Sequence, residues 1–368
     1  MRVLLLSKYS ALGASSRLRA LQYVPFLRAN GIEVTMAPLL SDNYVKGIYA
    51  HTRKDWFALL GSYLGRLKAL LATRQYDLLW IEKELFPRLP AYFEHLISSA
   101  GMRYVVDYDD AVFHDYDSNP HWAVRRLLGR KIDAVMRRSA VVITGNKYLA
   151  KRATEAGARR VEILPTAVSL ERYLPQQRNR SGGLFTVVWI GTPVTAKFLR
   201  IVSEPLATVA RMFPLKVKLI GSGPVCMEGV DVEVRPWSAE TESQELQSCD
   251  VGIMPLFDSP FERGKCGYKL IQYMSCGLPT IASPVGVNTE IVLPGVTGLW
   301  ANAASEWVSG MVTLAHDKQL GARLGAAVRK LVESKYCIDV TAPRLLEILR
   351  SAAKTEGKQR DAAELHSL

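Results

Sequence analysis

Short runs of aliphatic and β-branched residues alternate along the chain with longer stretches of helical spacing. This alternation predicts parallel strands that are joined by helices. We expect strands at Val3–Ser7, Glu33–Met36, Leu78–Ile81, Tyr104–Asp107, Val141–Thr144 and Val161–Leu164 in the first half, and at Thr186–Ile190, Lys216–Ile220, Val232–Arg235, Val251–Met254, Thr280–Ala282 and Leu299–Trp300 in the second. Six strands in each half is the content of a doubly wound sheet. The sequence therefore predicts an α/β protein with two parallel sheets.

The two halves are expected to be Rossmann-like domains that meet at a linker. The segment Gln176–Gly183 is polar, ends in glycines and has no periodicity, as in interdomain linkers. We expect domains at 1–178 and 179–345, followed by a helix end and a polar tail at 346–368; the length of 368 residues agrees with two domains. Ligands of open α/β sheets bind at the carboxyl ends of the strands. We therefore expect the chemistry in loops that follow strands, around a cleft between the domains.

The positive charge is concentrated in the first half. Lys and Arg number 47 against 35 Asp and Glu, a surplus of 12. Residues 1–178 hold 27 of these basic and 16 of these acidic residues, so this half carries a surplus of 11. Such a surface suits an anionic partner, which could be a nucleic acid, an acidic membrane face or a phosphorylated substrate.

The sequence fits neither a membrane-spanning or exported protein nor a protein held together by disulfides or zinc. No apolar run approaches the roughly 18–20 residues that span a bilayer, and Val3–Leu6 is too short for a signal peptide, so we expect a cytoplasmic protein. An odd number of cysteines without a C-x-x-C pair favours reduced thiols over disulfides or a zinc site. These residues are Cys226, Cys249, Cys266, Cys276 and Cys337.

Two glycine-containing loops of the second half follow strands and could approach a ligand. Gly191-Thr192 opens the first of them, and Lys197 stands at the expected start of a helical stretch over Phe198–Phe213. Backbone N–H groups and one cation placed in this way can bind a phosphate. The alternative is an ordinary strand-to-helix turn with a solvated lysine. The second loop, at Gly221–Gly223, is a weaker signal because glycine is common in turns.

The segment Phe261–Met274 has the strongest phosphate-binding signal. Gly264 and Gly267 free the backbone, and Lys265 and Lys269 would share one face if a helix began here. A helix N-terminus already favours anions, so two lysines beside it would suit a diphosphate. The alternative is a solvated basic turn.

Two polar segments stand out in the first half. Asp107, Asp109 and Asp110 follow a strand and could hold a metal ion, orient an acceptor hydroxyl, act as a base, or serve only as turn residues. The second segment follows the first strand and opens a helix. It contains Gly13, Ser15, Ser16, Arg17 and Arg19, where a serine could be the N-cap and the arginines could bind a phosphate or be solvated.

The stretch from Trp56 to Leu71 is an amphipathic helix with aromatic and basic residues, as in helices that lie in a membrane interface. Neighbouring cations are Arg53, Lys54, Arg66, Lys68 and Arg74, and further pairs follow Trp122 at Arg125-Arg126, Arg130-Lys131 and Arg137-Arg138. An anionic leaflet attracts such clusters. The alternative is that the apolar residues pack on the sheet and the cations form a solvated face. Together with the charge of this half, the pattern favours peripheral contact with the inner face of a membrane.

Several separate motifs resemble one enzyme family. They are the run Lys269–Ser283 with Val285-Gly286 and Glu290, the segments Ile163–Val168 and Leu170–Tyr173, and the run Asp250–Leu256. In this order they resemble the retaining glycosyltransferases of family four, which have the GT-B fold. The resemblance extends from Met1 to about Ile348 and is most specific in the second half.

The resemblance implies transfer of a sugar from a nucleotide-diphospho-sugar to a glycan or lipid-linked acceptor, in the synthesis of cell-surface polysaccharide or glycolipid. It implies no cofactor and no metal, with Lys197, Lys265 and Asp109 as catalytic residues. The donor-binding residues would be Gly191, Thr192, Lys197, Gly221, Glu262, Gly264, Lys265, Cys266, Gly267, Tyr268, Lys269 and Gln272. The acceptor side would be formed by Gly13, Ser15, Ser16, Arg17, Asp107, Asp109 and Asp110.

The chain departs from the family pattern in the E-x7-E motif and in the first loop. Gln272 stands where the second glutamate is usual, and Gly264 stands at the first, with Glu262 nearby as a substitute. Thr192 replaces the usual arginine, which Lys265 or Lys269 could replace in function. An amide can still bind a ribose hydroxyl, without ionic strengthening.

Other functions remain to be weighed against transfer. A nucleotide-sugar 2-epimerase of the same architecture would need no acceptor, and a non-catalytic homologue would only bind the nucleotide-sugar. A nicotinamide oxidoreductase is disfavoured because neither half has the G-x-G-x-x-G fingerprint. We find no nucleic-acid recognition module and expect no nucleic-acid partner.

Overall fold

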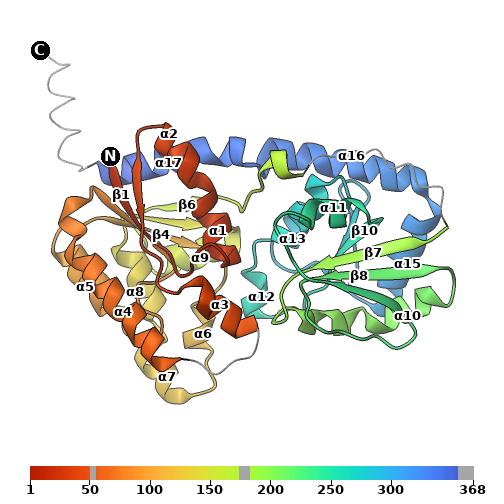
Figure 1. Cartoon of the computed structure of the whole chain (residues 1–368), viewed down its shortest axis with the longest axis horizontal. Helices are drawn as coiled ribbons and strands as arrows, with labels where there is room; N and C mark the ends of the chain where they lie inside the picture. Colours follow the sequence, from red (N-terminus) through yellow and green to blue (C-terminus); the bar gives the residue numbers. More distant parts are fainter. Residues whose placement is uncertain (50–54, 174–182, 355–368) are drawn as a thin grey trace, which may run out of the picture. The chain divides into compact units, whose positions relative to one another are not determined.

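The computed structural model describes residues 1–49, 55–173 and 183–354, and these residues form two compact units. The first unit contains Met1–Pro165 together with the segment that begins at Thr341, and the second contains Thr166–Val340 (Figure 1). The linker expected at Gln176–Gly183 lies outside the described residues except for Gly183.

The first unit contains a six-stranded parallel sheet in the order β2-β1-β3-β4-β5-β6. The strands are β1 (Arg2–Leu6), β2 (Glu33–Met36), β3 (Leu78–Glu82), β4 (Tyr104–Tyr108), β5 (Val141–Thr144) and β6 (Val161–Ile163). The helices are α1 (Ala14–Arg19), α2 (Val24–Ala29), α3 (Asp42–Tyr49), α4 (Trp56–Leu71), α5 (Tyr92–Ser99), α6 (His114–Asp117), α7 (Trp122–Leu128), α8 (Lys131–Arg138) and α9 (Lys147–Glu155), with 3-10 turns at Leu21–Tyr23 and Thr73–Gln75. Strands β3 and β4 are buried throughout, as expected for a parallel sheet covered on both faces.

The second unit contains another six-stranded parallel sheet, in the order β12-β11-β10-β7-β8-β9. Its strands are β7 (Phe185–Ile190), β8 (Leu215–Ile220), β9 (Asp231–Arg235), β10 (Val251–Met254), β11 (Thr280–Ala282) and β12 (Leu299–Trp300). Its helices are α10 (Ser203–Ala210), α11 (Glu242–Gln247), α12 (Pro260–Arg263), α13 (Tyr268–Ser275), α14 (Asn288–Ile291), α15 (Ala304–His316) and α16 (Lys318–Lys335), with 3-10 turns at Leu170–Arg172 and Ala196–Ile201. All twelve expected strands are present.

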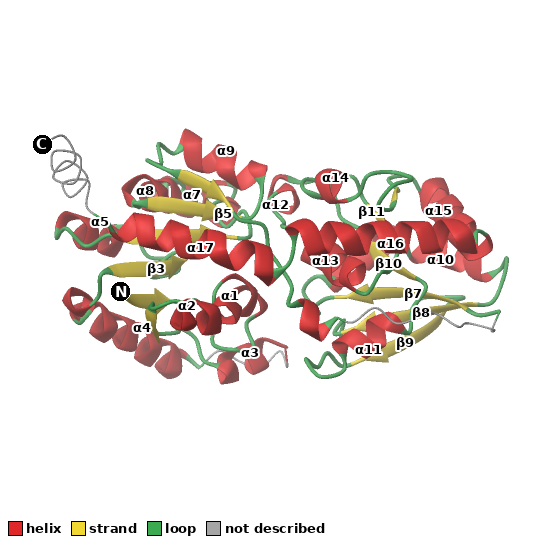
Figure 2. Ribbon diagram, turned by 90° about the horizontal axis from the view of Figure 1, so that it is seen from above, coloured by secondary structure: helices red, strands yellow, loops and turns green. Residues whose placement is uncertain are grey.

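Alternate side chains of β7 build two hydrophobic layers, one on each face of the second sheet. Val188 and Ile190 pack with residues of α13 and α16, and Figure 2 shows these helices over the sheet. Val187 and Trp189 belong to a separate cluster with residues of α10 and α15. Because successive side chains of a strand point to opposite faces, one apolar strand serves both layers.

The last described helix, α17 (Ile338–Ala353), packs on the first unit from Thr341 onward. The Thr341 and Tyr23 hydroxyls are hydrogen-bonded at 2.9 Å, and the Arg344 and Arg350 guanidinium groups donate to the carbonyls of Ile163 and Asn30. The buried face of α17 includes Leu345, Leu349 and Ala352, so the apolar stripe continues to residue 352. From composition we expected these residues in the second domain and the tail. Nothing in the local sequence indicates that the chain returns to the first unit. The expected tail from residue 355 onward lies outside the described residues.

Candidate active site

In the first unit β2 and β3 lie on opposite sides of β1, so the strand order changes direction between β1 and β3. Ligands of open α/β sheets bind at the carboxyl ends of the strands at such a point. Residues that follow β1 and end β3 and β4 meet at this edge. The Glu82 carboxylate accepts hydrogen bonds from the Lys8 backbone N–H at 2.8 Å and the Ser16 hydroxyl at 2.5 Å. Ser16 is therefore a buried structural residue that ties α1 to the end of β3.

Asp109 is the centre of the polar cluster. One of its carboxylate oxygens accepts from the Ser15 hydroxyl at 2.5 Å, and the other lies 2.8 Å from the Lys83 ammonium nitrogen. Burial alone would raise the pKa of Asp109, but the charge of Lys83 and the hydrogen bonds from Lys83 and Ser15 lower it to about 2. Burial alone would lower the pKa of Lys83, yet Asp109 and Asp110 raise it well above its ordinary value. The pair is an ion pair at neutral pH, which suits orienting a hydroxyl better than removing its proton.

Asp107 has a different environment from Asp109. It lies inside β4 rather than in the loop, only 2% of its side chain is exposed, and its carboxylate accepts from the Arg19 guanidinium at 2.9 Å. Burial raises the pKa of Asp107 to about 6 against the effect of Arg19. Arg19 also donates to the Leu164 carbonyl. The expectation that Arg19 meets a phosphate is wrong, because its guanidinium is buried within the fold.

The remaining acceptor-side residues lie around this cluster. Asp110 is 3.9 Å from the Lys83 ammonium nitrogen and is more exposed than Asp109. Arg17 is partly exposed and donates to the Ala11 carbonyl. Gly13 packs against Tyr9 so closely that an added Cβ would lie 2.2 Å from the Tyr9 Cβ. Ser15, Asp109 and Asp110 are thus brought together, whereas Gly13 shapes the loop.

Glu82 and Lys83 were not among the expected site residues. The charged triplet Glu82-Lys83-Glu84 follows the fully apolar run of β3 directly, which was a usable signal. Lys83 also has a left-handed φ of +64°, uncommon for a residue other than glycine. Strain of this kind concentrates at functional sites, and the ammonium of this residue is paired with Asp109.

In the second unit, the loops after β7 and β8 touch through their backbones. Gly221 has a φ of +73°, and an added Cβ would lie 2.4 Å from the Gly191 carbonyl oxygen. Thr192 and Thr195 close the first loop on itself: the Thr195 hydroxyl accepts from the Thr192 N–H and donates to the Thr192 carbonyl at 3.0 Å. The chain then forms the 3-10 turn Ala196–Ile201 before α10, so the helical stretch predicted from Phe198 is broken at its start.

Three charged groups surround the first loop. The Lys197 ammonium lies 3.9 Å from the Glu262 carboxylate, which also accepts from the Ser259 hydroxyl. The Lys269 ammonium lies 5.3 Å from the ring centroid of Trp189, whose ring packs against Gly191. Lys197, Glu262 and Lys269 are therefore gathered around the loop that Gly191 opens.

The expectation that Lys265 and Lys269 share a helix face is wrong. The helix α13 begins only at Tyr268, and Lys265 lies in the connection after α12 with its ammonium 5.2 Å from the Phe261 ring centroid. Gly267 is the N-cap of α13 with a φ of +66°, whereas Gly264 ends α12 in an ordinary right-handed conformation. Tyr268 packs partly against the core, and Cys266 is buried. The backbone turns at Gly267, which is why the two lysines separate.

Gln272 lies in a buried network rather than at an open surface. Its amide nitrogen donates to the Glu242 carboxylate at 2.7 Å, and only 4% of the residue is exposed. The Tyr173 hydroxyl and the Trp237 indole N–H donate to the same carboxylate. Trp237 is partly exposed and lies beside Gly221, where an added Cβ would be 3.1 Å from the Trp237 Cβ. Glu242, which sequence reasoning did not single out, connects Gln272 to the glycine loops.

Acidic residues of the described ranges do not assemble into a metal site. Within 1–49, 55–173 and 183–354, no three His, Cys, Asp or Glu side chains gather so that they could hold a metal ion. Around Asp109 the positive charge comes from the Lys83 ammonium instead. Among the same residues, no helix is long and apolar enough to cross a membrane.

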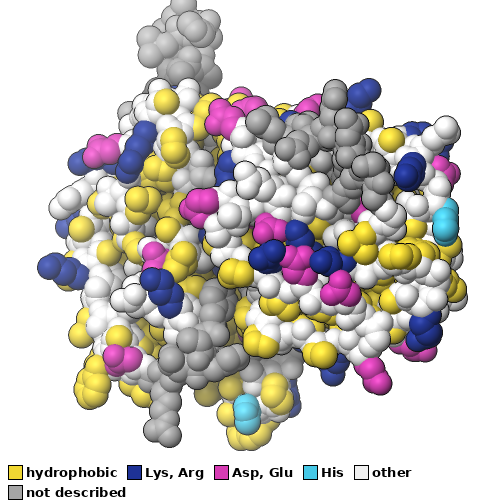
Figure 3. All heavy atoms as spheres, turned by 45° about the vertical axis from the view of Figure 1, so that its right-hand side comes forward, with side chains coloured by type: hydrophobic (Ala, Val, Ile, Leu, Met, Phe, Trp, Pro, Cys, Tyr) yellow, Lys and Arg dark blue, Asp and Glu magenta, His cyan; other side chains and the backbone are white. Residues whose placement is uncertain are grey.

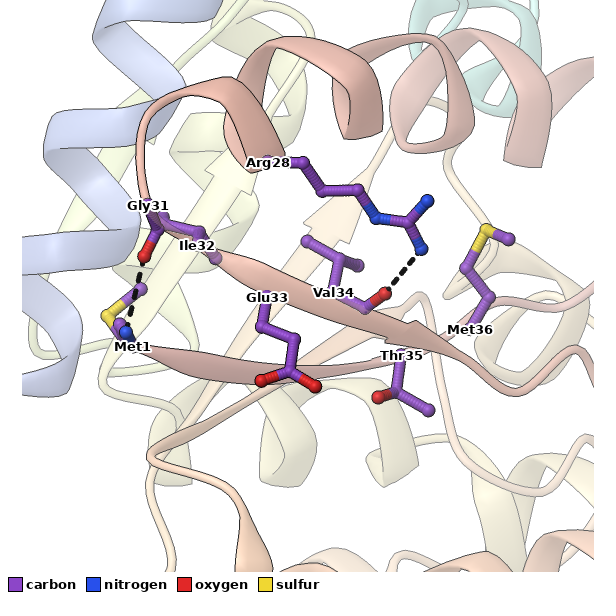
Figure 4. Close-up of a pocket in the computed structure, with 8 residues that line it drawn as sticks. All are labelled: Met1, Arg28, Gly31, Ile32, Glu33, Val34, Thr35 and Met36. Atoms are coloured by element: carbon purple, nitrogen blue, oxygen red, sulfur yellow. Dashed lines mark hydrogen bonds between the residues drawn. The ribbon is translucent and has the colours of Figure 1, made fainter.

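One hollow of the described surface lies elsewhere. It has a volume of about 760 Å³ and runs along the whole of β2, the edge strand of the first sheet. Figure 4 shows Arg28 lying over the strand and donating to the Val34 carbonyl, with Met1 beside Gly31. It follows the strand rather than its carboxyl end, so we do not assign it to the reaction.

Comparison with known proteins gives one family match and many similar folds. Residues 185–317 match the family described as glycosyl transferases group 1. A D-inositol 3-phosphate glycosyltransferase of Pseudarthrobacter chlorophenolicus is 22% identical over 193 residues, which cover 46% of this chain and 45% of that protein. The chain thus matches less than half the length of this curated relative.

Solved structures resemble nearly the whole chain. Sucrose-phosphate synthase from Thermosynechococcus elongatus has a TM-score of 0.70 at 16% identity, covering 95% of this chain and 98% of that one. Anabaena HepE in complex with UDP has a TM-score of 0.71 at 16% identity, covering 95% and 100%. WaaG, a glycosyltransferase involved in lipopolysaccharide biosynthesis, has a TM-score of 0.66 at 12% identity, covering 95% and 99%. At these identities the structures establish the fold of the chain as GT-B, and the match to glycosyl transferases group 1 covers residues 185–317.

Proposed function

We propose that the protein transfers a sugar from a nucleotide-diphospho-sugar to a glycan or lipid-linked acceptor with retention of the anomeric configuration. The observation that carries this proposal is the gathering of Lys197 and Lys269 around the Gly191 loop, inside the part of the chain that matches the family. The loop lies at the carboxyl end of β7, next to β10, where the direction of chain progression reverses. This is the preferred ligand position of an open α/β sheet.

The second unit is proposed to bind the donor. The Gly191 and Gly221 backbones would approach the diphosphate, and the start of α13 would face it because a helix N-terminus favours anions. Lys197 and Lys269, with Lys265, would stabilise the charge that grows on the leaving phosphate. A nucleotide donor is supported by structures of similar fold, since Anabaena HepE has been solved with UDP and with UDP-glucose.

Gln272 is proposed to act through Glu242 rather than on the ribose directly. Its amide donates a hydrogen bond to the Glu242 carboxylate. The same carboxylate accepts from the Trp237 indole and so holds Trp237 beside Gly221. A buried polar network whose members are all satisfied holds a single arrangement. We therefore assign Gln272 and Glu242 a positioning role for the loops of the donor site.

The first unit is proposed to bind the acceptor at Asp109. The carboxylate is ionised, is held by Lys83 and Ser15, and can accept a hydrogen bond from an acceptor hydroxyl. Because the pKa of Asp109 is about 2, the carboxylate is a poor proton acceptor near neutral pH. In the proposed reaction, the bond from the anomeric carbon to the donor phosphate breaks while the bond to the acceptor oxygen forms on the same face. The acceptor proton passes to the leaving phosphate, so no protein nucleophile is needed and orientation supplies much of the catalysis.

The proposed setting is the cytoplasmic face of a membrane, in the synthesis of a cell-surface polysaccharide or glycolipid. The basic surplus of the first half supports contact with anionic lipid, although part of this charge is internal. Arg19, Arg66 and Lys131 are buried, and Lys131 is paired with Glu84. On the face drawn in Figure 3, basic and acidic side chains are interspersed. The attraction must therefore come from particular surfaces.

The test is a transfer assay with defined probes. UDP-glucose, GDP-mannose, ADP-glucose and dTDP-glucose are each incubated with octyl glucoside, and release of the nucleoside diphosphate and the anomer of the product are measured. We expect acceptor-dependent release and a product with the donor's anomeric configuration. Lys269→Met should abolish release, whereas Lys216→Met, which alters an ion-paired lysine of β8, should leave it unchanged. Turnover without acceptor that yields a 2-epimer would contradict the proposal.

A further inference from the structure

The amphipathic helix α4 carries a row of exposed apolar side chains on the side that faces away from the sheet. Five of its large apolar side chains face outward at helical spacing, whereas Leu59, Tyr63, Leu67 and Leu70 are half-buried and its one fully buried residue is Arg66. The exposed fractions of its outward residues are 67% for Trp56, 88% for Phe57, 59% for Leu60, 57% for Leu64 and 86% for Leu71. From Phe57 to Leu71 this stripe is about 21 Å long at 1.5 Å per residue.

Polar contacts explain why the Arg66 side of α4 faces the sheet. The Arg66 guanidinium donates to the Ser7 carbonyl at 2.5 Å and to the Ala37 carbonyl at 3.1 Å, at the ends of β1 and β2. The Tyr63 hydroxyl donates to the Pro87 carbonyl at 2.8 Å. These bonds fix the rotation of the helix, and the apolar stripe must then face away from the protein.

The exposed apolar surface continues onto α5. The rings of Tyr63 and Phe86 lie 5.4 Å apart and those of Phe86 and Phe93 lie 4.6 Å apart, so α4 and α5 pack side by side through Phe86. Figure 1 shows the two helices next to each other in the first unit. Leu89, Tyr92 and Leu96 are exposed along this second helix and the loop before it. We call the outward residues of both helices the α4–α5 face.

The charges around the α4–α5 face are mostly positive, with the exposed N-cap Asp55 at the start of α4 as an acidic neighbour. The sequence of α4 contains no acidic residue, and the sole acid between Leu85 and Ser99 is Glu94, which is buried and accepts from the Leu85 N–H. The exposed cations beside the face are Lys68, Arg74 and Arg88. Outward aromatic and leucine side chains flanked mainly by cations are the composition of a helix that lies in the interface of an anionic bilayer.

We propose that the α4–α5 face is the membrane-docking surface of the protein, with Phe57, Leu60 and Leu64 inserted among the acyl chains of anionic lipid. This inference rests on the membrane contact proposed above and names the surface that makes it. The charge complementarity selects anionic lipid over a second copy of this chain, because two such faces would bring cations together. The inferred docking does not depend on the identity of the donor or the acceptor.

Vesicle co-sedimentation tests the proposal with the full chain. The probes are vesicles of phosphatidylcholine alone and of phosphatidylcholine with about 30% phosphatidylglycerol, a composition chosen to give a negative surface. We expect binding to the anionic vesicles at least tenfold stronger than to the neutral ones. The double variant Phe57→Ser/Leu64→Ser should bind at least tenfold more weakly, and Lys68→Gln/Arg74→Gln several-fold more weakly. The matched control is Met212→Ser, which removes an exposed apolar side chain from the second unit.

The outcomes distinguish failure of the α4–α5 face as the docking surface from failure of the proposed membrane contact itself. Anionic binding that Phe57→Ser/Leu64→Ser leaves intact would retain the membrane contact but overturn the α4–α5 face. Absence of binding to both vesicle types would overturn both. Sedimentation equilibrium of the wild type gives a further check, because a dimer that Phe57→Ser/Leu64→Ser dissociates would make a second copy the occupant and overturn the proposal. Quenching of Trp56 by brominated lipid, read against Trp56→Phe, should show the residue at acyl-chain depth.

Discussion

The amide nitrogen of Gln272 lies 2.7 Å from a carboxylate oxygen of Glu242, at the centre of a buried network in the second unit. Tyr173 and Trp237 donate to the same carboxylate. The network shows why an amide stands at position 272: a carboxylate there would face a second carboxylate at hydrogen-bond distance. The residue type at position 272 is therefore determined by Glu242, which is close in space but distant in sequence.

Restoring the glutamate that is usual in the family should therefore damage this protein. We expect Gln272→Glu to lower the free energy of unfolding by about 3 kcal/mol at pH 7.5, because it buries an unpaired like charge beside Glu242. The double variant Gln272→Glu/Glu242→Gln should recover most of this loss, since it restores one charge and one amide. Urea unfolding of the wild type, of Gln272→Glu, of Glu242→Gln and of the double variant gives the coupling energy. Additive effects of the two substitutions would show that the residues do not interact.

Loss of the Asp109 charge should impair transfer more than donor binding. We expect Asp109→Asn to reduce kcat/KM for the acceptor at least a hundredfold, because the buried Lys83 loses its partner and the acceptor loses its orienting carboxylate. The dissociation constant for the nucleoside diphosphate should stay within twofold. Asp110→Asn is the control, since Asp110 lies farther from Lys83 and is more exposed. Equal losses in both variants would argue against a special role for Asp109.

The lysines around the Gly191 loop should carry the affinity for diphosphate. We expect Lys197→Ala and Lys269→Ala each to weaken binding of the nucleoside diphosphate about tenfold to a hundredfold, by removing one charge-assisted contact. Titration calorimetry at two salt concentrations measures the effect and its screening. Lys216→Ala should leave the affinity unchanged, because that ammonium lies near Asp231 and Glu233. A loss of affinity in Lys216→Ala as large as in the other two would contradict the assignment.

Asp107 should give the protein a measurable pH dependence of stability. The pKa of its carboxyl is 3.8 before burial and about 6 in the fold, so the folded state binds more protons than the unfolded state between these pH values. Stability that depends on Asp107 is therefore present below pH 4 and is lost as pH rises through 6, by up to about 3 kcal/mol. The difference in unfolding free energy between wild type and Asp107→Asn, measured from pH 4.5 to 7.5, should fall with increasing pH. A difference in unfolding free energy that stays constant or rises with pH would contradict the raised pKa of Asp107.

The strands were predictable because both faces of a parallel sheet are covered, which requires near-continuous apolar runs such as Leu78–Ile81. The positions of Gly191 and Gly221 at the sheet edge were also predictable, since both follow strands directly, whereas their role in donor binding stays a prediction. The pairing of Gln272 with Glu242 was not, because α11 and α13 meet only in the folded unit. The inward side of α4 was hidden for a similar reason: helical spacing defines two faces, and the carbonyls of Ser7 and Ala37 decide that Arg66 faces the sheet.

Thermal unfolding of the purified protein with a panel of UDP-, GDP-, ADP- and dTDP-sugars tests the central claim, that the second unit binds a nucleotide-diphospho-sugar. A ligand at 100 times its dissociation constant should stabilise the fold by about 2.7 kcal/mol. We predict a raised Tm with one nucleotide class, in EDTA as well as in Mg²⁺, and a clearly smaller rise in Lys269→Ala at the same ligand concentration. Unchanged melting with every nucleotide-sugar would contradict the account.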